Sequence, residues 1–261
     1  MSGRSSTPSP RVRAVQFIQK QGNDLAKHTA AALLGVTDGE HAADAVRAMQ
    51  CTDGGFSATG CDPSVLAETR RVLGVLDDLG IRDGDLLQAV CAHLARLQRD
   101  DGRWGCGSED DEDLFETGMI LTHLAKTTSA RIDMLEAAAD FLSGLWSPDR
   151  VQGFEWRPLM AYAGTFSNLS HERSDEILQW CGRELERGFR TGRFDGVQTV
   201  RLLSWCDAPQ LPGGRLEPAE LLKSIFEGQA EDGGWLEPGE ASIINRVGHT
   251  LAALVGLRRL E

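Results

Sequence analysis

Residues 229–235 read QAEDGGW, and the pattern Gln-x-x-Asp-Gly-x-aromatic occurs twice more, at 50–56 (QCTDGGF) and at 98–104 (QRDDGRW). Each copy follows an apolar stretch with helical periodicity, such as residues 86–97. A glycine at this place ends a helix, and we expect the aromatic side chain to fold back over the helix end. The three copies indicate a repeated helical unit, which is the feature of a sequence to recognise first.

A second helical pattern follows each turn and carries a threonine ahead of a leucine-rich face. Thr69 and Thr117 lie 16 residues after the aspartate of their turns, and Thr250 lies 18 residues after its own. An N-terminal copy and two degenerate copies in the middle of the chain supply the other marker threonines, Thr29, Thr165 and Thr199. We expect these threonines to be structural and to bond back to the preceding helical turn. Six helix pairs then occupy residues 11–261, after a disordered lead at 1–10.

Paired-helix repeats build either an open solenoid or a closed toroid. A solenoid needs polar capping repeats at both ends, whereas the first and last copies here, AKHTAAAL at 26–33 and VGHTLAAL at 247–254, are apolar and similar to each other. We therefore predict an all-α fold, an (α/α)6 toroid of six helix pairs in a single domain. The open solenoid remains the alternative.

Composition narrows the possible partners. The chain has 261 residues, a net charge of −12 and a sequence pI near 5.0. Such acidity argues against nucleic-acid binding and against anionic membranes, and no apolar run approaches the roughly 20 residues of a membrane-spanning helix. The six cysteines form no C-x-x-C pair. They predict reduced thiols and a cytoplasmic location.

The turn followed by a Thr-Ala-Leu-x-x-Leu helix resembles the repeat of the terpenoid cyclase and protein prenyltransferase toroid superfamily, which includes squalene–hopene cyclases and class II diterpene cyclases. The resemblance extends over residues 11–261 and is strongest in the second, third and sixth copies. It implies a closed toroid around a central cavity and, more loosely, an isoprenoid substrate.

Two departures from the family motifs affect the chemistry. Class II cyclases carry Asp-x-Asp-Asp before the marker threonine, and the position of their proton donor holds Phe115 here, between Asp113 and Glu116. His249 and Thr250 match the His-Thr pair that contributes the zinc histidine in prenyltransferases. The Asp-x-Cys partner of that histidine is missing, so one zinc ligand of three is matched.

The residues directly before the marker threonines form the predicted site. They are His28, Glu68, Glu116, Gly164, Gln198 and His249. If they face inward, two histidines and two glutamates converge on one cavity, where they would serve as acids and bases or hold a metal. We assign catalytic roles to Asp113 and Glu116, with Glu68, His28 and His249 in support. The alternative is that these side chains make hydrogen bonds between neighbouring helices.

Substrate-binding roles go to aromatic residues and to polar residues near the same level. Aromatic faces stabilise carbocations. The polar residues are Gln198 of the predicted site and two residues, Asp195 and Arg246, that each lie four positions before a marker threonine. The full set is Phe115, Tyr162, Phe166, Phe194, Gln198, Asp195 and Arg246. Arg246 would pair either with an anionic substrate group or with a surface carboxylate. So few aromatic residues argue for a substrate that is smaller or more polar than squalene.

The sequence thus predicts an enzyme that catalyses acid-initiated cyclisation or isomerisation of an isoprenoid or other polyene. No cofactor is certain. The acidic run at 109–113 would suit Mg²⁺ and a diphosphate, or would simply favour a helix N-terminus, and Zn²⁺ is the other candidate. Two alternatives stay open: a metal-dependent transferase or hydrolase that uses the His/Glu residues, and a non-catalytic toroid that binds a lipid or an intermediate.

Overall fold

The computed structural model describes residues 8–37, 39–60, 62–105, 110–153, 155–236 and 242–260. These residues form an all-α structure without a strand, apart from two isolated bridges inside turns. The helices are α1 (Pro10–Gln21), α2 (Asp24–Leu33), α3 (Glu40–Arg47), α4 (Leu66–Asp78), α5 (Asp85–Leu97), α6 (Asp110–Leu124), α7 (Ile132–Leu145), the 3-10 helix η1 (Pro148–Arg150), α8 (Trp156–Asn168), α9 (Ser174–Arg190), α10 (Gly196–Trp205), α11 (Pro218–Glu227) and α12 (Ile243–Leu260).

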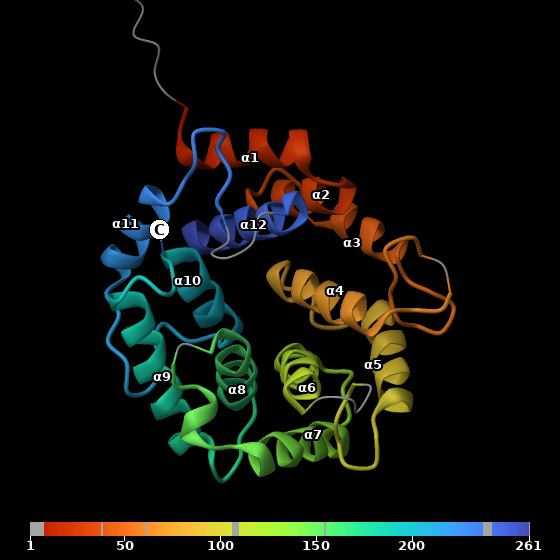
Figure 1. Cartoon of the computed structure of the whole chain (residues 1–261). Helices are drawn as coiled ribbons and strands as arrows, with labels where there is room; N and C mark the ends of the chain where they lie inside the picture. Colours follow the sequence, from red (N-terminus) through yellow and green to blue (C-terminus); the bar gives the residue numbers. More distant parts are fainter. Residues whose placement is uncertain are drawn as a thin grey trace, which may run out of the picture.

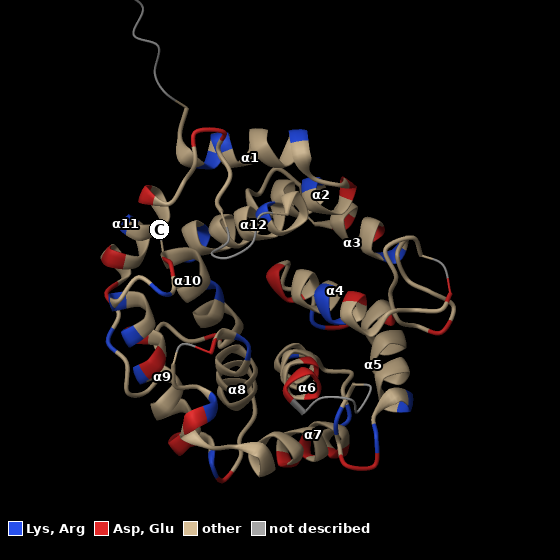
Figure 2. Ribbon diagram, viewed as in Figure 1, with Lys and Arg blue, Asp and Glu red and all other residues tan. Residues whose placement is uncertain are grey.

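Even-numbered helices lie around the centre of the molecule, and odd-numbered helices lie outside them (Figure 1). All six marker threonines fall on even-numbered helices and are buried. The even-numbered helices pack in sequence, α4 on α6, α6 on α8, α8 on α10 and α10 on α12, and α12 packs on α2. Acidic and basic segments are interspersed around the outer helices and turns (Figure 2). Among the described residues, no helix combines the length and apolar character needed to cross a membrane.

The glutamine of each turn joins one outer helix to the next. Gln98 Nε2 donates to the carbonyl of Gly102 in its own turn (2.8 Å) and to that of Met134 in α7 (2.9 Å). The other two turns make the same pair of bonds, from Gln50 to Gly54 and Leu86 and from Gln229 to Gly233 and Pro10. The turn after α5 therefore binds α7, and the turn after α3 binds α5.

The last turn, which follows α11, binds α1 in the same way that the other turns bind the next outer helix. Gln229 Nε2 lies 2.8 Å from the Pro10 carbonyl, although the two residues are 219 positions apart. Arg11, on the same helix, donates to the carbonyl of Leu257 in α12 at 3.0 Å. The chain thus joins its first and last helices by the bond that links consecutive copies elsewhere.

The aromatic residue of the turn closes the preceding helix, as predicted. Trp104 Nε1 donates to the carbonyl of Leu94 in the last turn of α5 (2.8 Å), and the Trp104 amide donates to Thr117 Oγ1 (2.9 Å). The same amide-to-threonine bond joins Phe56 to Thr69 and Trp235 to Thr250. The predicted bond back to the preceding helical turn is confirmed for Thr29, Thr199 and Thr250.

Most of the predicted disordered lead, residues 1–7, lies outside the described residues. Ser9 caps α1, because its hydroxyl accepts from the Val12 amide, and Pro10 is the first helical residue. The first helix therefore begins one residue before the predicted boundary.

Candidate functional site

A pocket of about 300 Å³ lies where the C-terminal ends of even-numbered helices meet. Small-molecule sites commonly enclose about 300–1,000 Å³, so this volume suits a small ligand. The lining comes from the ends of α2, α4, α10 and α12 and the loop after α4: Leu33, Asp77, Asp78, Leu79, Gly80, Arg82, Ser204, Asp207, Val255, Arg258 and Arg259. A narrower hollow beside it adds residues of α6 and the segment after it, including His123 and Lys126.

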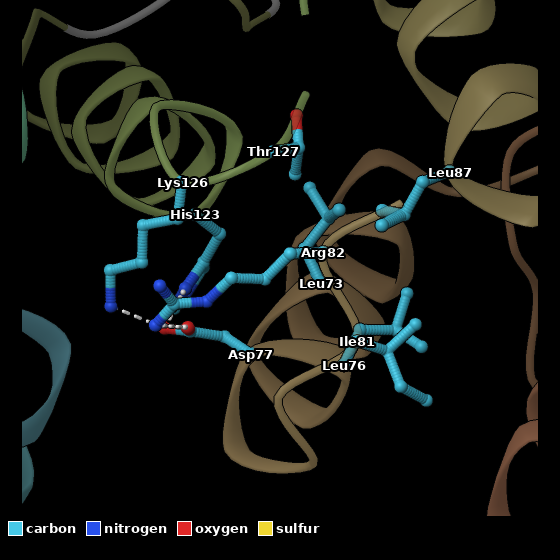
Figure 3. A pocket seen from close by; sticks show the side chains of 9 residues that line it. All are labelled: Leu73, Leu76, Asp77, Ile81, Arg82, Leu87, His123, Lys126 and Thr127. Carbon is cyan, nitrogen blue, oxygen red and sulfur yellow. Dashed lines mark hydrogen bonds and ion pairs between the residues drawn. The ribbon is translucent and has the colours of Figure 1, made fainter. Parts of the chain in front are cut away.

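Asp77 is the centre of a buried ionic network beside the pocket. Figure 3 shows Arg82, His123 and Lys126 extending toward its carboxylate. The Asp77 carboxylate accepts from Lys126 Nζ at 2.7 Å and from His123 Nδ1 at 3.1 Å, and Arg82 lies 3.9 Å away. The Asp77, His123 and Lys126 side chains are each at most 8% exposed. Because a carboxylate only accepts hydrogen bonds, Nδ1 of His123 carries the proton.

Asp78 makes an ion pair across the centre of the molecule. Its carboxylate binds the guanidinium of Arg201, 123 positions away in α10, and α4 and α10 lie on opposite sides of the centre (Figure 1). The Asp78 side chain is 8% exposed and that of Arg201 is 17% exposed. Arg201 also stacks on Trp205, 4.4 Å from the ring centroid, and Trp205 meets the ring of His123 edge-on. This pair joins α4 to α10, two helices that are distant in the sequence.

The two adjacent carboxyls differ in acidity. Burial alone would raise the pKa of Asp77, but the hydrogen bond and charge of His123 and the charge of Lys126 lower that pKa to about 2. Burial raises the pKa of Asp78, Arg201 opposes the rise, and the charge of Asp77 adds to it. Burial also lowers the pKa of His123, against the opposite influence of Asp77. The pocket wall therefore holds one firmly ionised carboxylate beside one that retains a proton more readily.

Three arginines and three aspartates line the pocket, and two of the arginines have no carboxylate partner among the described residues. Arg82 pairs with Asp207 at 2.9 Å, so these two charges compensate each other. Arg258 and Arg259 are exposed at the end of α12, and within the described ranges neither forms an ion pair. Two uncompensated guanidinium groups on a chain of net charge −12 favour an anionic ligand group at this rim.

Among the predicted catalytic residues, Glu116 is buried but already paired. Arg70 Nε donates to both of its carboxylate oxygens at 3.0 Å. The neighbouring Phe115 lies against two guanidinium groups, with Arg70 4.8 Å and Arg157 4.1 Å from its ring centroid. Glu116 does not line the described pocket, and the ring of Phe115 is already in contact with cations of the protein.

Asp113, to which the sequence analysis gave a catalytic role, does not line the described pocket. Its side chain is fully buried, and a carboxylate oxygen lies 3.2 Å from Arg103 Nη1. Arg246 pairs with Asp232, 2.8 Å from the carboxylate, which is the surface salt bridge and not a free substrate-binding cation. Charged residues of the repeat turns, Arg103 and Asp232, hold these two predicted site residues.

Three predicted residues from two helices do meet. His249 Nε2 lies 3.0 Å from Asp195 Oδ2, and the other Asp195 oxygen accepts from the Gln198 amide at 2.7 Å. Gln198 Oε1 accepts in return from the Asp195 amide, which completes a capping box at the start of α10. Asp195 thus both begins α10 and orients His249 of α12. This group lies at the opposite end of the even-numbered helices from the pocket.

The predicted His/Glu cluster does not form. His28 packs near His41 of α3, with ring centroids 6.0 Å apart, and Glu68 pairs with Arg71 on its own helix. Residues one position apart on a helix point about 100° apart. In the second, third and sixth copies the threonine accepts a hydrogen bond from the turn, so the preceding side chain points in a different direction. In the described part of the chain, the one group able to hold a metal is Cys51, Asp53 and Asp62.

The predicted aromatic lining is buried in the core. Tyr162 stacks on Phe166 with centroids 6.3 Å apart, and Trp146 meets Tyr162 edge-on at 4.8 Å. Phe194 packs against Trp156, also with centroids 4.8 Å apart. None of the three predicted residues lines the described pocket, so they serve packing between helices.

Sequence reasoning missed the ionic network at and beside the pocket, which consists of Asp77, Asp78, His123, Lys126 and Arg201. A signal was present, because an Asp-Asp pair eight and nine residues after Thr69 ends a helix where the dipole disfavours acidic groups. Such a placement indicates that the carboxylates have other partners. Which partners they have depends on contacts between distant helices.

The stability of the protein should depend on pH through Asp77. A lowered carboxyl pKa contributes stability above the unfolded value of 3.8, and this contribution is lost as the pH falls toward about 2. The shift corresponds to about 2 kcal/mol. Urea unfolding of wild type and Asp77→Asn should therefore differ by about that amount at pH 6 and converge near pH 2. A difference that stayed constant between these pH values would contradict the assignment.

No protein-family model and no curated protein sequence matches this chain. Its function therefore has to be inferred from the chemistry of the pocket.

Proposed function

We propose that the chain is a closed (α/α)6 toroid and an enzyme that catalyses acid-initiated isomerisation or cyclisation of a small isoprenoid or polyene. The toroid is supported by the alternation of inner and outer helices and by the bond from Gln229 to Pro10. The resemblance of the repeats to terpenoid cyclases supports the substrate class. The observation that carries the reaction is the pair Asp77 and Asp78, whose pKa values are moved in opposite directions at the wall of one pocket.

When two adjacent carboxyl groups have different pKa values, the one with the higher pKa can act as an acid while the other remains an anion. Arg201 pairs with Asp78 but does not offset the burial that raises the Asp78 pKa. Asp78, in its protonated form, gives its proton to one carbon of a substrate double bond, and a carbocation forms at the neighbouring carbon. The ionised Asp77 stabilises that positive charge electrostatically. Loss of a proton from another substrate carbon to the Asp78 carboxylate regenerates the acid and leaves an isomer.

This assignment replaces Asp113 and Glu116, neither of which lines the pocket. The rest of the pocket suits an apolar molecule with an anionic end. Leu33, Leu79 and Val255 supply an apolar wall, and Arg258 and Arg259 supply the charge at the rim. The volume of about 300 Å³ favours a substrate smaller than squalene.

The test is product analysis by mass spectrometry after incubation with a panel of prenyl diphosphates, prenyl carboxylates and squalene, with and without Mg²⁺. We expect wild type to give an isomeric or cyclic product and Asp78→Asn to reduce its rate by about 100-fold or more, because general acid catalysis commonly contributes that much. Asp83→Asn, which changes an exposed carboxylate after the same helix, is the matched control and should retain activity.

Glu116→Gln in the same assay separates the two assignments of the acid. Loss of activity in the folded Glu116→Gln protein, with activity retained in Asp78→Asn, would return the acid to Glu116. Saturable binding of a substrate without turnover in any protein would support the non-catalytic alternative.

A further inference from the structure

A serine, a histidine and an aspartate meet beside the first repeat turn, at the opposite end of α4 from the pocket. Ser64 Oγ lies 3.2 Å from His93 Nε2 and 2.8 Å from Asp53 Oδ2. The distance along α4 from this group to Asp78 is about 18 Å at 1.5 Å per residue. The group is therefore separate from the site proposed above.

The protein fixes which nitrogen of His93 bears a proton. Nδ1 lies 3.0 Å from the backbone carbonyl of Asp53, and a carbonyl oxygen can only accept, so Nδ1 is the donor. The Asp53 carboxylate lies 3.7 Å from the same nitrogen. In the neutral ring Nε2 is then an acceptor 3.2 Å from Ser64 Oγ, and the Ser64 hydroxyl donates to the Asp53 carboxylate at 2.8 Å. This is the arrangement of a nucleophile, its base and a group that orients the base.

The turn does not need this trio for its own stability. In each copy the turn glutamine binds a backbone carbonyl of the next outer helix. The residue seven positions after that carbonyl is His93 for the first turn, but Phe141 and Phe17 for the two equivalent turns. There an arginine lies over the phenylalanine, Arg103 over Phe141 at 5.9 Å and Arg246 over Phe17 at 4.7 Å.

Each of those arginines also pairs with the turn aspartate, Asp101 or Asp232. Of these three turns, only the first has a serine beside a histidine where the other two have an arginine beside a phenylalanine. Two of three equivalent turns thus achieve the same fold with side chains that carry no nucleophile.

Gly55 permits the close approach of Ser64 and His93, and Ser64 remains partly exposed. A Cβ at Gly55 would lie 2.5 Å from Ser64 Oγ and 2.6 Å from His93 Nε2, so the pair fits only against a glycine. Ser64 is half-buried between the exposed Pro63 and Val65. His93 is only 4% exposed, so its ring is held in place while the serine remains accessible.

We propose that Ser64 and His93 form a nucleophile and general base that react with small activated carboxylic esters. The Ser64 hydroxyl turns from the Asp53 carboxylate to His93 Nε2, and Ser64 Oγ attacks the ester carbonyl carbon while its proton passes to that nitrogen. The C–O bond to the leaving alcohol breaks, and that alcohol takes the proton from His93. Water, deprotonated by the same nitrogen, then hydrolyses the acyl-serine and restores the hydroxyl. The Asp53 carbonyl positions the ring throughout.

Covalent labelling with a fluorophosphonate probe tests this proposal, because the probe reacts with activated serines. We expect one label per chain on the full-length protein, mapped to Ser64 by peptide mass spectrometry. Labelling should be absent in Ser64→Ala and at least about 100-fold slower in His93→Gln. Ser143→Ala, which removes a hydroxyl bonded locally to the Asp140 carbonyl, should label as wild type does.

A second test uses the variant Ser64→Cys, so that the proposal can still be judged if one of the variants above is unstable. Iodoacetamide should alkylate this cysteine faster than it alkylates the cysteine in Ser64→Cys/His93→Gln, with circular dichroism confirming that both are folded. No label on wild type, or equal rates with and without His93, would overturn the proposal. Hydrolysis of p-nitrophenyl acetate, lost in Ser64→Ala, is the catalytic counterpart.

Discussion

Replacing Arg201 with methionine is expected to lower the free energy of unfolding by about 3–5 kcal/mol, the usual cost of removing one partner of a buried ion pair. The change leaves the Asp78 carboxylate, 8% exposed, without its guanidinium partner. Adding Asp78→Asn should restore a large part of the loss, because the remaining charge is then removed as well. Chemical denaturation of the wild type, both single variants and the double variant gives the coupling energy of the pair.

Arg71→Met is the control for this comparison. Arg71 pairs with Glu68 on the surface of the same helix, with 41% of its side chain exposed. Its loss should cost about 0.5 kcal/mol or less. A double variant Arg201→Met/Asp78→Asn no more stable than Arg201→Met would show that stacking on Trp205, and not the ion pair, is the source of the effect.

Gly102→Ala should destabilise the protein by about 3 kcal/mol. The glycine has a φ of +88°, and an added Cβ would lie 2.1 Å from the Ala137 carbonyl oxygen in α7. A left-handed conformation at a residue other than glycine costs about 1–3 kcal/mol, and forced overpacking costs a similar amount. Thermal unfolding followed by circular dichroism measures the change.

Gly248→Ala provides the matched substitution in the interior of α12, where an added Cβ would meet nothing within 4 Å. There alanine should stabilise the protein by about 0.5–1 kcal/mol, because glycine is the poorer helix former. Equal effects of the two substitutions would mean that the close approach of the turn to α7 is not needed for folding.

The helical fold could be read from the sequence because the repeat is local. Gln98, Gly102, Trp104 and Thr117 lie close together along the chain, and each makes a bond whose partner type follows from its place in the turn. The weak fourth and fifth copies were still placed correctly as helices by Thr165 and Thr199. Periodicity alone did not choose between an open and a closed arrangement.

The site could not be read in the same way. Its main pairs join α4 to α6 and α4 to α10, at separations of 46 positions for Asp77 and His123 and 123 for Asp78 and Arg201. No local pattern specifies which carboxylate will find which cation. The sequence reasoning placed the site at the level of the marker threonines, since the family motif lies there, and arginines outside that motif neutralise the carboxylates found at that level.

The joined first and last helices have a consequence for how the molecule opens. In an open solenoid a terminal repeat has one neighbour and frays at a lower free energy than the middle of the chain. Here α1 is fastened to the turn after α11 through Gln229 and to α12 through Arg11. We therefore expect α1 to detach only when its contacts with α12 and with the turn after α11 break, and to open at a higher free energy than a terminal repeat with one neighbour. The same fastening requires the chain to close a loop of 219 positions, so it is a late step in folding and a slow one.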